Sequence, residues 1–307
     1  MGHENQSSMI KVTNKWPHQN SVKVEWNLGK RCNYDCSYCP SSIHDNSSKH
    51  TDIEILKSTV DKLMTLGKPI RLSFTGGEPT VHPKFKELVQ YCKHVGITWI
   101  SVTTNGTLPV EFYSSLPVDQ YVFSIHFEYD WMKVVTTLRE IVDHTKIKVI
   151  GQIMAHHDHM TFVRIVRQVL NNEQIANTVR RIRWTEGDHN IFDDMRYHPD
   201  DYKWLIEQEA TVSPNTVITY KDKEELLHAN DVIKLHKNKY KNWTCYAGIE
   251  SLMINWDGDT HRATCRVGNS LGNIYNGTFL GTTEPINCTR DWCTCAADIP
   301  LTKIKND

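Results

Sequence analysis

Three cysteines near the start of the chain have a spacing that suits metal chemistry. Cys32, Cys36 and Cys39 lie in the segment NLGKRCNYDCSYCP. Three thiolates on one short loop reach three corners of a [4Fe–4S] cube and leave the fourth iron open to another ligand. The alternative is zinc with His44 as a fourth ligand, although zinc motifs usually pair one CxxC with a second one at a distance. The segment therefore predicts a metal centre, either an iron–sulfur cluster or zinc.

A second motif, Gly76-Gly77-Glu78-Pro79, stands at the end of a predicted strand over residues 70–75. Two glycines let a backbone approach a ligand closely, and a carboxylate beside them can hold an ammonium group. Alone, GGEP would be an ordinary turn. It follows CxxxCxxC by one βα unit, and Tyr38 precedes the third cysteine. The pair resembles the radical S-adenosylmethionine (radical SAM) superfamily, whose motif is CxxxCx-aromatic-C followed by GGE, and this favours the cluster over zinc.

The resemblance implies a cofactor set and a reaction. The three cysteines would bind a [4Fe–4S] cluster, whose open iron would chelate the amino and carboxylate groups of S-adenosylmethionine. Reductive cleavage would give methionine and a 5′-deoxyadenosyl radical that takes hydrogen from an unactivated carbon. A flavodoxin or ferredoxin would supply the electron. The implied nucleotide contacts are Gly76, Gly77 and Glu78 to the ammonium group, Tyr38 to adenine, and Thr103, Thr104, Asn105, Ser124 and Gln152 from strand ends.

A second group of cysteines lies near the other end of the chain. Cys245 and Cys265 bracket Asp257-Gly258, a strong hairpin signal, and CTRDWCTC supplies Cys288, Cys293 and Cys295. This resembles the twitch/SPASM extension of the same superfamily, in its shorter form, and implies one auxiliary [4Fe–4S] cluster. The family usually has CxxC where this chain has CxC. We predict ligation by Cys245, Cys265, Cys293 and Cys295, with Cys288 substituting for one or free; a zinc ribbon is the alternative.

Histidines follow two of the predicted strands and are candidate general bases. His126 and Glu128 come after the strand over 120–126, and the run from His156 to His159 comes after the strand over 147–154. A histidine titrates near neutrality, so we predict His126 and His156 as catalytic candidates. A polar loop or a metal site is the alternative for the run. Glu186 and Asp188, after the last predicted strand, are further candidates.

The elements that must position these groups follow a βα pattern. β-branched runs alternate with amphipathic helices, which predicts an α/β fold, a partial (β/α)6 TIM-type barrel with a small C-terminal hairpin-containing cluster domain. Cys92 falls on the inner face of one helix, as an ordinary core residue. Further helices are predicted over 200–210 and 222–237. The predicted strands are 22–27, 70–75, 98–104, 120–126, 147–154 and 179–185.

The same pattern divides the chain into parts. Residues 1–20 are predicted to be an extension, 21–190 the barrel, 191–240 a helical linker region and 241–307 the auxiliary cluster domain. Nine cysteines in 307 residues are too few for a disulfide scaffold, and they indicate metal binding in a reducing compartment.

The charge and the apolar content of the chain limit the kinds of partner that we expect it to bind. The formal net charge of −1 gives no footprint for nucleic acid, and no run of 18 apolar residues or signal-peptide core is present. We therefore expect a cytoplasmic protein that binds neither nucleic acid nor membrane.

The sequence favours a radical SAM enzyme that oxidises a small molecule with the help of an auxiliary cluster. The alternative substrate is a ribosomally made peptide, to be crosslinked or epimerised. Because only about 20 residues precede the first predicted strand, we expect no N-terminal leader-binding domain, which tilts the choice toward small molecules. A non-catalytic iron–sulfur or zinc protein is the third reading.

Overall fold

The computed structural model describes most of the chain as two compact units. The described residues are 9–15, 20–186, 190–193, 196–208, 214–221 and 223–305. The central unit comprises Trp26–Leu63 and Arg71–Thr211, and the terminal unit comprises Met1–Glu25, Met64–Ile70 and Val212–Asp307. The predicted division of the chain into four parts, at residues 1–20, 21–190, 191–240 and 241–307, stays a prediction.

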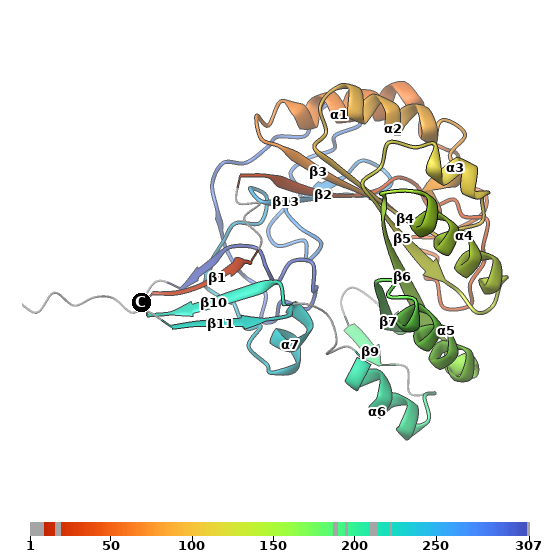
Figure 1. Cartoon of the computed structure of the whole chain (residues 1–307). Helices are drawn as coiled ribbons and strands as arrows, with labels where there is room; N and C mark the ends of the chain where they lie inside the picture. Colours follow the sequence, from red (N-terminus) through yellow and green to blue (C-terminus); the bar gives the residue numbers. More distant parts are fainter. Residues whose placement is uncertain are drawn as a thin grey trace, which may run out of the picture. The chain divides into compact units, whose positions relative to one another are not determined.

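A parallel sheet forms the frame of the central unit. Its strands lie in chain order, and the pairs from β3 to β7 are all parallel. The helices between them lie along the outer side of the sheet (Figure 1). The strands are β2 (Val22–Asn27), β3 (Ile70–Thr75), β4 (Trp99–Thr104), β5 (Gln120–Ile125), β6 (Lys148–Ala155) and β7 (Asn177–Arg181). The helices are α1 (Ile53–Met64), α2 (Phe85–His94), α3 (Val110–Ser114), α4 (Trp131–His144) and α5 (Met160–Asn172), with short 3₁₀ turns η1 (Pro79–Val81) and η2 (His157–His159).

Apolar side chains hold the helices to this sheet. Strand β3 buries every second residue, and its Phe74 ring lies 5.5 Å from Phe85, the first residue of α2. Helix α2 also buries Leu88, Val89 and Cys92. Spacings of three and four residues place these side chains on one helical face, as the sequence pattern requires. Cys92 is therefore a core residue.

The predicted fold class is confirmed, as a partial barrel. Strands β2 and β3 have the predicted bounds, β4 and β5 differ from their predictions by one residue at one end, and β6 differs by one residue at each end. Among the pairings of the described residues, none joins β7 back to β2, so the barrel is open. The six predicted strands thus give the correct architecture.

The sixth predicted strand, over 179–185, is wrong in its bounds. The ladder with β6 ends at Arg181, and Arg183–Glu186 instead forms β8, paired antiparallel with β9 (Asn190–Asp193). The backbone N–H of Ile182 donates to the Tyr197 hydroxyl, which takes the chain out of the parallel ladder. A tertiary contact therefore decides a break that the apolar run does not show.

The helix predicted over 222–237 is also wrong in part. Lys223–Leu227 forms strand β11, antiparallel to β10 (Thr216–Tyr220), and only Ala229–Lys234 is helical, as α7. The KEELL segment favours a helix by propensity, but sheet pairing outweighs that preference. The helix predicted over 200–210 matches α6 (Pro199–Gln208).

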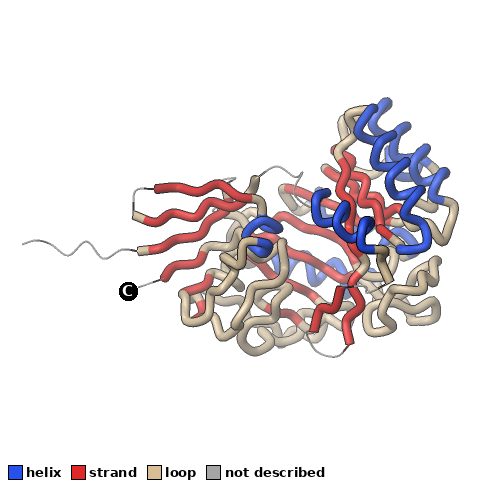
Figure 2. The backbone as a smooth tube through the Cα atoms, turned by 90° about the horizontal axis from the view of Figure 1, so that it is seen from below, coloured by secondary structure: helices blue, strands red, loops and turns tan. Residues whose placement is uncertain are grey.

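The terminal unit is built on an antiparallel sheet that uses both ends of the chain. Its order is β11-β10-β1-β16-β12-β15, and its strands lie side by side near the C-terminal end (Figures 1 and 2). The N-terminal segment, predicted to be an extension, supplies strand β1. The remaining strands are β1 (Ile10–Asn14), β12 (Thr244–Cys245), β15 (Ile286–Asn287) and β16 (Lys303–Lys305).

The hairpin predicted at Asp257-Gly258 is present in this unit. Strands β13 (Ser251–Ile254) and β14 (Thr260–His261) pair antiparallel, with Ile254 opposite Thr260. Gly258 has a φ of +88°, a conformation that favours glycine. The connection is five residues long, because the pairing stops at Ile254 and Thr260.

Membrane-spanning helices are absent from the described part of the chain. The longest helix, α4, has 14 residues, and none combines the length and apolar character that a bilayer crossing needs.

The buried position of Cys92 yields a first prediction. Replacement Cys92→Ala should lower the free energy of unfolding by about 1 kcal/mol, because it removes one buried group of roughly methylene size. Iron content per chain should not change, since Cys92 lies inside the α2 packing. Chemical denaturation and iron analysis of the purified variant measure both. A loss of iron would show that Cys92 takes part in metal binding.

Candidate functional site

The three N-terminal cysteines line one cavity in the central unit. They lie in the loop that follows β2, which is fixed by a hydrogen bond from Cys32 N–H to the Asp45 carbonyl (2.7 Å) and by a turn from Cys39 N–H to the Cys36 carbonyl (3.0 Å). The cavity has a volume of about 120 Å³. Its lining also includes Gly76, Gly77, Glu78, Thr103, Thr104, Asn105, Ser124, His126 and His44.

The two glycines bring the end of β3 against the cysteine loop. Gly77 N–H donates to the Gly29 carbonyl (2.8 Å), and Glu78 N–H donates to the Arg31 carbonyl (2.9 Å). A Cβ on Gly77 would lie 2.3 Å from the Lys30 carbonyl oxygen, and one on Gly76 would lie 2.5 Å from that of Gly29. No side chain fits between the two backbones. The glycines are therefore needed for the loop to reach the strand.

Glu78 is buried, with 3% of its surface exposed, and its carboxylate is bonded by protein groups. Oε1 accepts from the Thr80 N–H (3.0 Å) and from the hydroxyls of Thr80 (2.6 Å) and Thr104 (2.9 Å). Oε2 accepts from the Asn105 N–H (2.6 Å). Burial raises the pKa of this carboxyl group, and the four donors oppose that shift. Glu78 thereby ties the end of β3 to the end of β4.

The predicted nucleotide contacts fall into two sets. Asn105 lies beside the cysteines: its side-chain amide donates to Asn33 (2.7 Å) and lies 3.9 Å from Cys32 Sγ. Ser124 also lines the cavity. Gln152 is outside the lining, and its amide donates to the Ser124 hydroxyl at 3.4 Å. The structure thus places Gln152 behind Ser124.

Tyr38 and His126 form a hydrogen-bonded pair next to Cys36. The Tyr38 hydroxyl lies 2.6 Å from His126 Nδ1, which is 3.4 Å from Cys36 Sγ. Burial lowers the pKa of His126 to about 4, so the imidazole is neutral at neutral pH. Nδ1 then accepts a hydrogen bond from the Tyr38 hydroxyl, and the pair fixes both rings at the edge of the site.

His156 lies near Tyr38, and neither residue lines the cavity. Its ring centroid is 5.8 Å from that of Tyr38, and its Nε2 is 3.9 Å from the Glu128 carboxylate. Asp158 N–H donates to His156 Nδ1 (3.3 Å), so the neutral ring carries its proton on Nε2, toward Glu128. Burial lowers the pKa of His156, and the neighbouring His157 adds to the effect.

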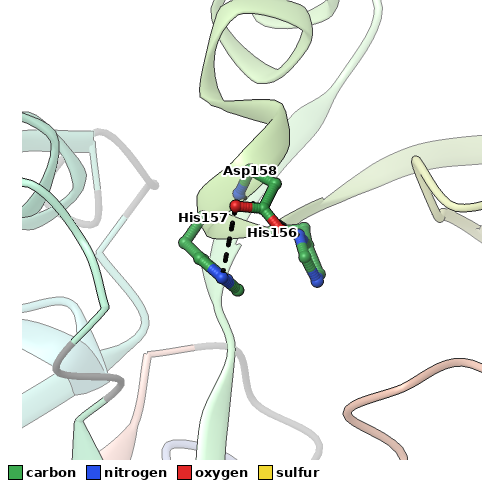
Figure 3. Close-up of side chains that lie close together, drawn as sticks. All are labelled: His156, His157 and Asp158. Carbon is green, nitrogen blue, oxygen red and sulfur yellow. Dashed lines mark hydrogen bonds and ion pairs between the residues drawn. The ribbon is translucent and has the colours of Figure 1, made fainter.

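The histidine run brings together three side chains that could ligate a metal. Among the described residues, the ligand atoms of His156, His157 and Asp158 lie within 4.8 Å of one another (Figure 3). The two imidazoles stack, with centroids 4.5 Å apart and planes 28° apart. The metal site predicted as the alternative for this run stays a prediction.

The alternative zinc reading needs His44 as a fourth ligand, because a closed structural zinc site has four ligands. His44 is already engaged in this structure. Its Nε2 lies 2.6 Å from the Tyr34 carbonyl oxygen, and its Nδ1 lies 4.0 Å from the Asp35 carboxylate. These contacts speak against His44 as a metal ligand.

The buried thiols of the three N-terminal cysteines need a positive charge nearby before they can ionise. Burial raises the pKa of Cys36 to about 12 and that of Cys39 to about 11, and it also raises the pKa of Cys32. The free thiols are therefore protonated at neutral pH. Thiolates form here when cationic iron replaces the protons, as in other metal sites with cysteine ligands.

Three comparisons bear on the identity of the central unit. The family described as the Radical SAM superfamily matches residues 26–145. The chain carries a radical SAM domain. Members of this superfamily use S-adenosylmethionine and a [4Fe–4S] cluster. The three cysteines and the glycine-lined wall of the cavity fit both groups.

Curated relatives match the radical SAM domain over part of their length. Fe-coproporphyrin III synthase of Methanosarcina barkeri is 36% identical over 86 residues, which cover 28% of this chain and 21% of that protein. A probable GTP 3′,8-cyclase of Methanothermobacter marburgensis is 28% identical over 164 residues, 50% of this chain and 51% of that protein. The chain thus spans between a fifth and a half of these relatives.

A solved structure extends the likeness in fold to most of the chain. Native anSMEcpe with bound AdoMet and a Cp18Cys peptide has a TM-score of 0.55 at 17% identity, over 84% of this chain and 78% of that chain. At this identity the likeness concerns the fold.

The five C-terminal cysteines lie together within the terminal unit. Cys245, Cys288 and Cys293 are buried in its apolar cluster, and Cys265 packs against it. Burial raises the pKa of Cys293 to about 12 and also raises that of Cys265 and Cys295. These thiols are therefore protonated at neutral pH, like those of the central unit.

Residues after β5 hold the cysteine loop, a role that sequence reasoning missed. The Tyr129 ring stacks on Tyr34 with centroids 3.8 Å apart, and its hydroxyl accepts from the Asp35 N–H (2.5 Å). Glu128, predicted as a possible base, accepts from the Ser37 N–H (3.1 Å). The sequence signal for this role is an acidic residue followed by an aromatic residue shortly after strand β5. Asp188 lies outside the described residues, and Glu186 ends β8.

The contact between the glycines and the cysteine loop yields a second prediction. Gly77→Ala should destabilise the folded protein by about 2 kcal/mol and abolish loading of the first cluster, because a rigid backbone meets the new methyl group. Iron analysis and thermal unfolding measure the effect. Gly29→Ala is the matched control, since a Cβ there meets nothing within 4 Å. Equal iron in the two variants would contradict the prediction.

Proposed function

We propose that the protein is a radical SAM enzyme that removes a hydrogen atom from a substrate C–H bond, assisted by an auxiliary [4Fe–4S] cluster in its terminal unit. One observation carries the first part. Three cysteines of one loop, the Gly76-Gly77 backbone and the polar ends of β4 and β5 line a single cavity.

The residues of this cavity have distinct tasks in the proposed reaction. Cys32, Cys36 and Cys39 hold the cluster. When bound, the cluster supplies one electron that cleaves S-adenosylmethionine to methionine and a 5′-deoxyadenosyl radical. The protein positions the nucleotide against one C–H bond and limits the access of water.

Positioning of the nucleotide would come from both sides of the cavity. The carbonyl edge of Gly76 and Gly77 would accept from the ammonium group, and Ser124 would contact the ribose. The Glu78 carboxylate already has four protein donors, so it would hold the strand ends in place rather than bind the ammonium directly. Tyr38, oriented by its bond to His126, would contact the adenine.

His126 and His156 are the two proposed proton acceptors. His156 Nδ1 would have to exchange its bond from the Asp158 N–H for the incoming proton, and the Glu128 carboxylate, 3.9 Å from Nε2, would stabilise the imidazolium. His126 is neutral and engaged with Tyr38 and Cys36, so its main proposed task is positioning.

The auxiliary cluster would be held by Cys245, Cys265, Cys293 and Cys295. The Cys265 N–H donates to the buried Asp298 carboxylate (2.7 Å), and Asp298 N–H donates to the Cys295 carbonyl (2.9 Å). These bonds link the hairpin cysteine to the CxC segment. Cys288 is buried in the same apolar cluster and would be the spare thiol.

The proposed substrate is a small molecule. The names of two relatives, a coproporphyrin synthase and a GTP cyclase, refer to small-molecule chemistry. A peptide is the second candidate, because a solved structure of similar fold contains a bound peptide. A flavodoxin or ferredoxin would supply the electron in either case.

Replacement of one N-terminal ligand tests the first half of the proposal. Cys36→Ala should abolish formation of 5′-deoxyadenosine from S-adenosylmethionine and reductant, because the cluster loses one of three thiolates. Chromatography of the quenched anaerobic reaction measures this, with Cys92→Ala as the buried-cysteine control. Cleavage at the wild-type rate in Cys36→Ala would refute the assignment.

Replacement of a C-terminal ligand tests the second half. Cys293→Ala should lower the iron content from about eight to about four per chain, which corresponds to loss of one of two [4Fe–4S] clusters. Formation of 5′-deoxyadenosine should continue, since the first cluster lies in the other unit. If both iron content and cleavage match the wild type, the auxiliary cluster is not held by Cys293.

A further inference from the structure

A buried lysine lies among the C-terminal cysteines. Lys303 begins strand β16, and 1% of its surface is exposed; of the described lysines it is the buried one. Its ammonium group donates to the carbonyls of Asp298 (2.7 Å), Ile299 (3.0 Å) and Leu301 (3.2 Å). All three N–H groups are therefore bonded, each to a neutral acceptor.

Sheet register places this lysine beside a proposed cluster ligand. In the antiparallel pair of β12 and β16, Cys245 stands directly opposite Lys303. Opposite residues point to the same face of a sheet, with their Cβ atoms about 5 Å apart. The ammonium group also lies 4.9 Å from the centroid of the buried Tyr240 ring. The Lys303 side chain thus shares the apolar cluster with the cysteines.

The carbonyls that Lys303 binds belong to the segment that follows the CxC motif. Asp298 accepts from the Cys265 N–H and donates to the Cys295 carbonyl, and Ile299 N–H also donates to the Cys295 carbonyl (3.2 Å). Lys303 therefore fixes the segment after Cys295, which is hydrogen-bonded to both Cys265 and Cys295.

The charge of this lysine requires compensation. An ammonium group is costly to bury unless an anion is near, and carbonyl bonds alone recover only part of the lost hydration. Asp298 supplies one carboxylate, but it is bonded to the backbone of Cys265. A [4Fe–4S] cluster with four thiolates is anionic in both of its common oxidation states, and more so when reduced.

We propose that Lys303 is the positioning residue that compensates the charge of the auxiliary cluster and raises its reduction potential. This inference rests on the proposed function, because it needs a cluster at Cys245, Cys265, Cys293 and Cys295. In this step one electron would pass to the cluster from the substrate radical that hydrogen abstraction leaves, and no bond forms or breaks in Lys303. The positive charge stabilises the reduced form more than the oxidised form and so makes the cluster a better electron acceptor.

Three substitutions separate the charge of Lys303 from its hydrogen bonds. Lys303→Met removes both, Lys303→Gln keeps a donor without the charge, and Lys303→Arg keeps the charge. Lys305→Met is the matched control, because Lys305 is exposed at the end of the same strand. Each full-length protein is loaded anaerobically, its iron is counted, and its clusters are titrated with electron paramagnetic resonance detection. Added S-adenosylmethionine identifies the first cluster, since only the cluster with an open iron responds.

The expected result is a more negative midpoint for the auxiliary cluster in the two neutral variants. At a fixed potential we expect the ratio of reduced to oxidised auxiliary cluster to fall about tenfold, or about 59 mV for a one-electron couple. Lys303→Arg and Lys305→Met should match the wild type. If Lys303→Met and Lys303→Gln lose the second cluster while Lys303→Arg retains it, the charge is needed to hold the cluster, which also supports the proposal.

Two results would overturn this inference. One is an unchanged midpoint in a fully loaded Lys303→Met or Lys303→Gln protein. The other is equal loss of iron in all three Lys303 variants, which would show a structural role without a role for charge. A wild-type protein with only about four irons would instead refute the auxiliary cluster itself, and with it the proposed function.

Discussion

The contact between two backbones, at Gly77 and the loop after β2, is the constraint on which the central site depends. Gly77 and Glu78 donate to carbonyls of the cysteine loop, and the distances leave no room for a side chain. Buried Glu78 then carries the constraint to the end of β4 through Thr104 and Asn105. The Gly76-Gly77-Glu78 motif thus assembles the cavity. In the proposed function the same stretch of backbone would also bind the nucleotide.

The cysteines of the central unit and those of the terminal unit are buried in different surroundings. In the central unit Cys32, Cys36 and Cys39 line a cavity together with polar side chains at the strand ends. In the terminal unit Cys245, Cys288 and Cys293 are part of an apolar core, and buried Lys303 stands opposite Cys245 in the sheet. A buried thiolate is costly without a cation, so thiols in either place stay protonated until a metal replaces the proton.

How much of this could be read from the sequence depends on the range of the interactions. The parallel strands and the cysteine and glycine motifs are encoded by residues close together, and β2 and β3 have the bounds that their alternation predicts. The break at Ile182 and strand β11 depend on partners distant in sequence, the Tyr197 hydroxyl and β10, so local patterns misassigned them. The sequence also does not reveal that Glu78, Glu128 and Tyr129 support loops. The residue type is the same whether its side chain binds a ligand or a backbone group.

The antiparallel sheet of the terminal unit has a consequence for the order in which the protein matures. Strand β1 (Ile10–Asn14) lies between β10 (Thr216–Tyr220) and β16 (Lys303–Lys305), so both of its partners are distant from it in the chain. This sheet can therefore form only after β16 has left the ribosome, whereas the parallel strands of the central unit are consecutive and can pair as they emerge. The loop of Cys32, Cys36 and Cys39 can thus fold before the cysteines of the terminal unit are brought together.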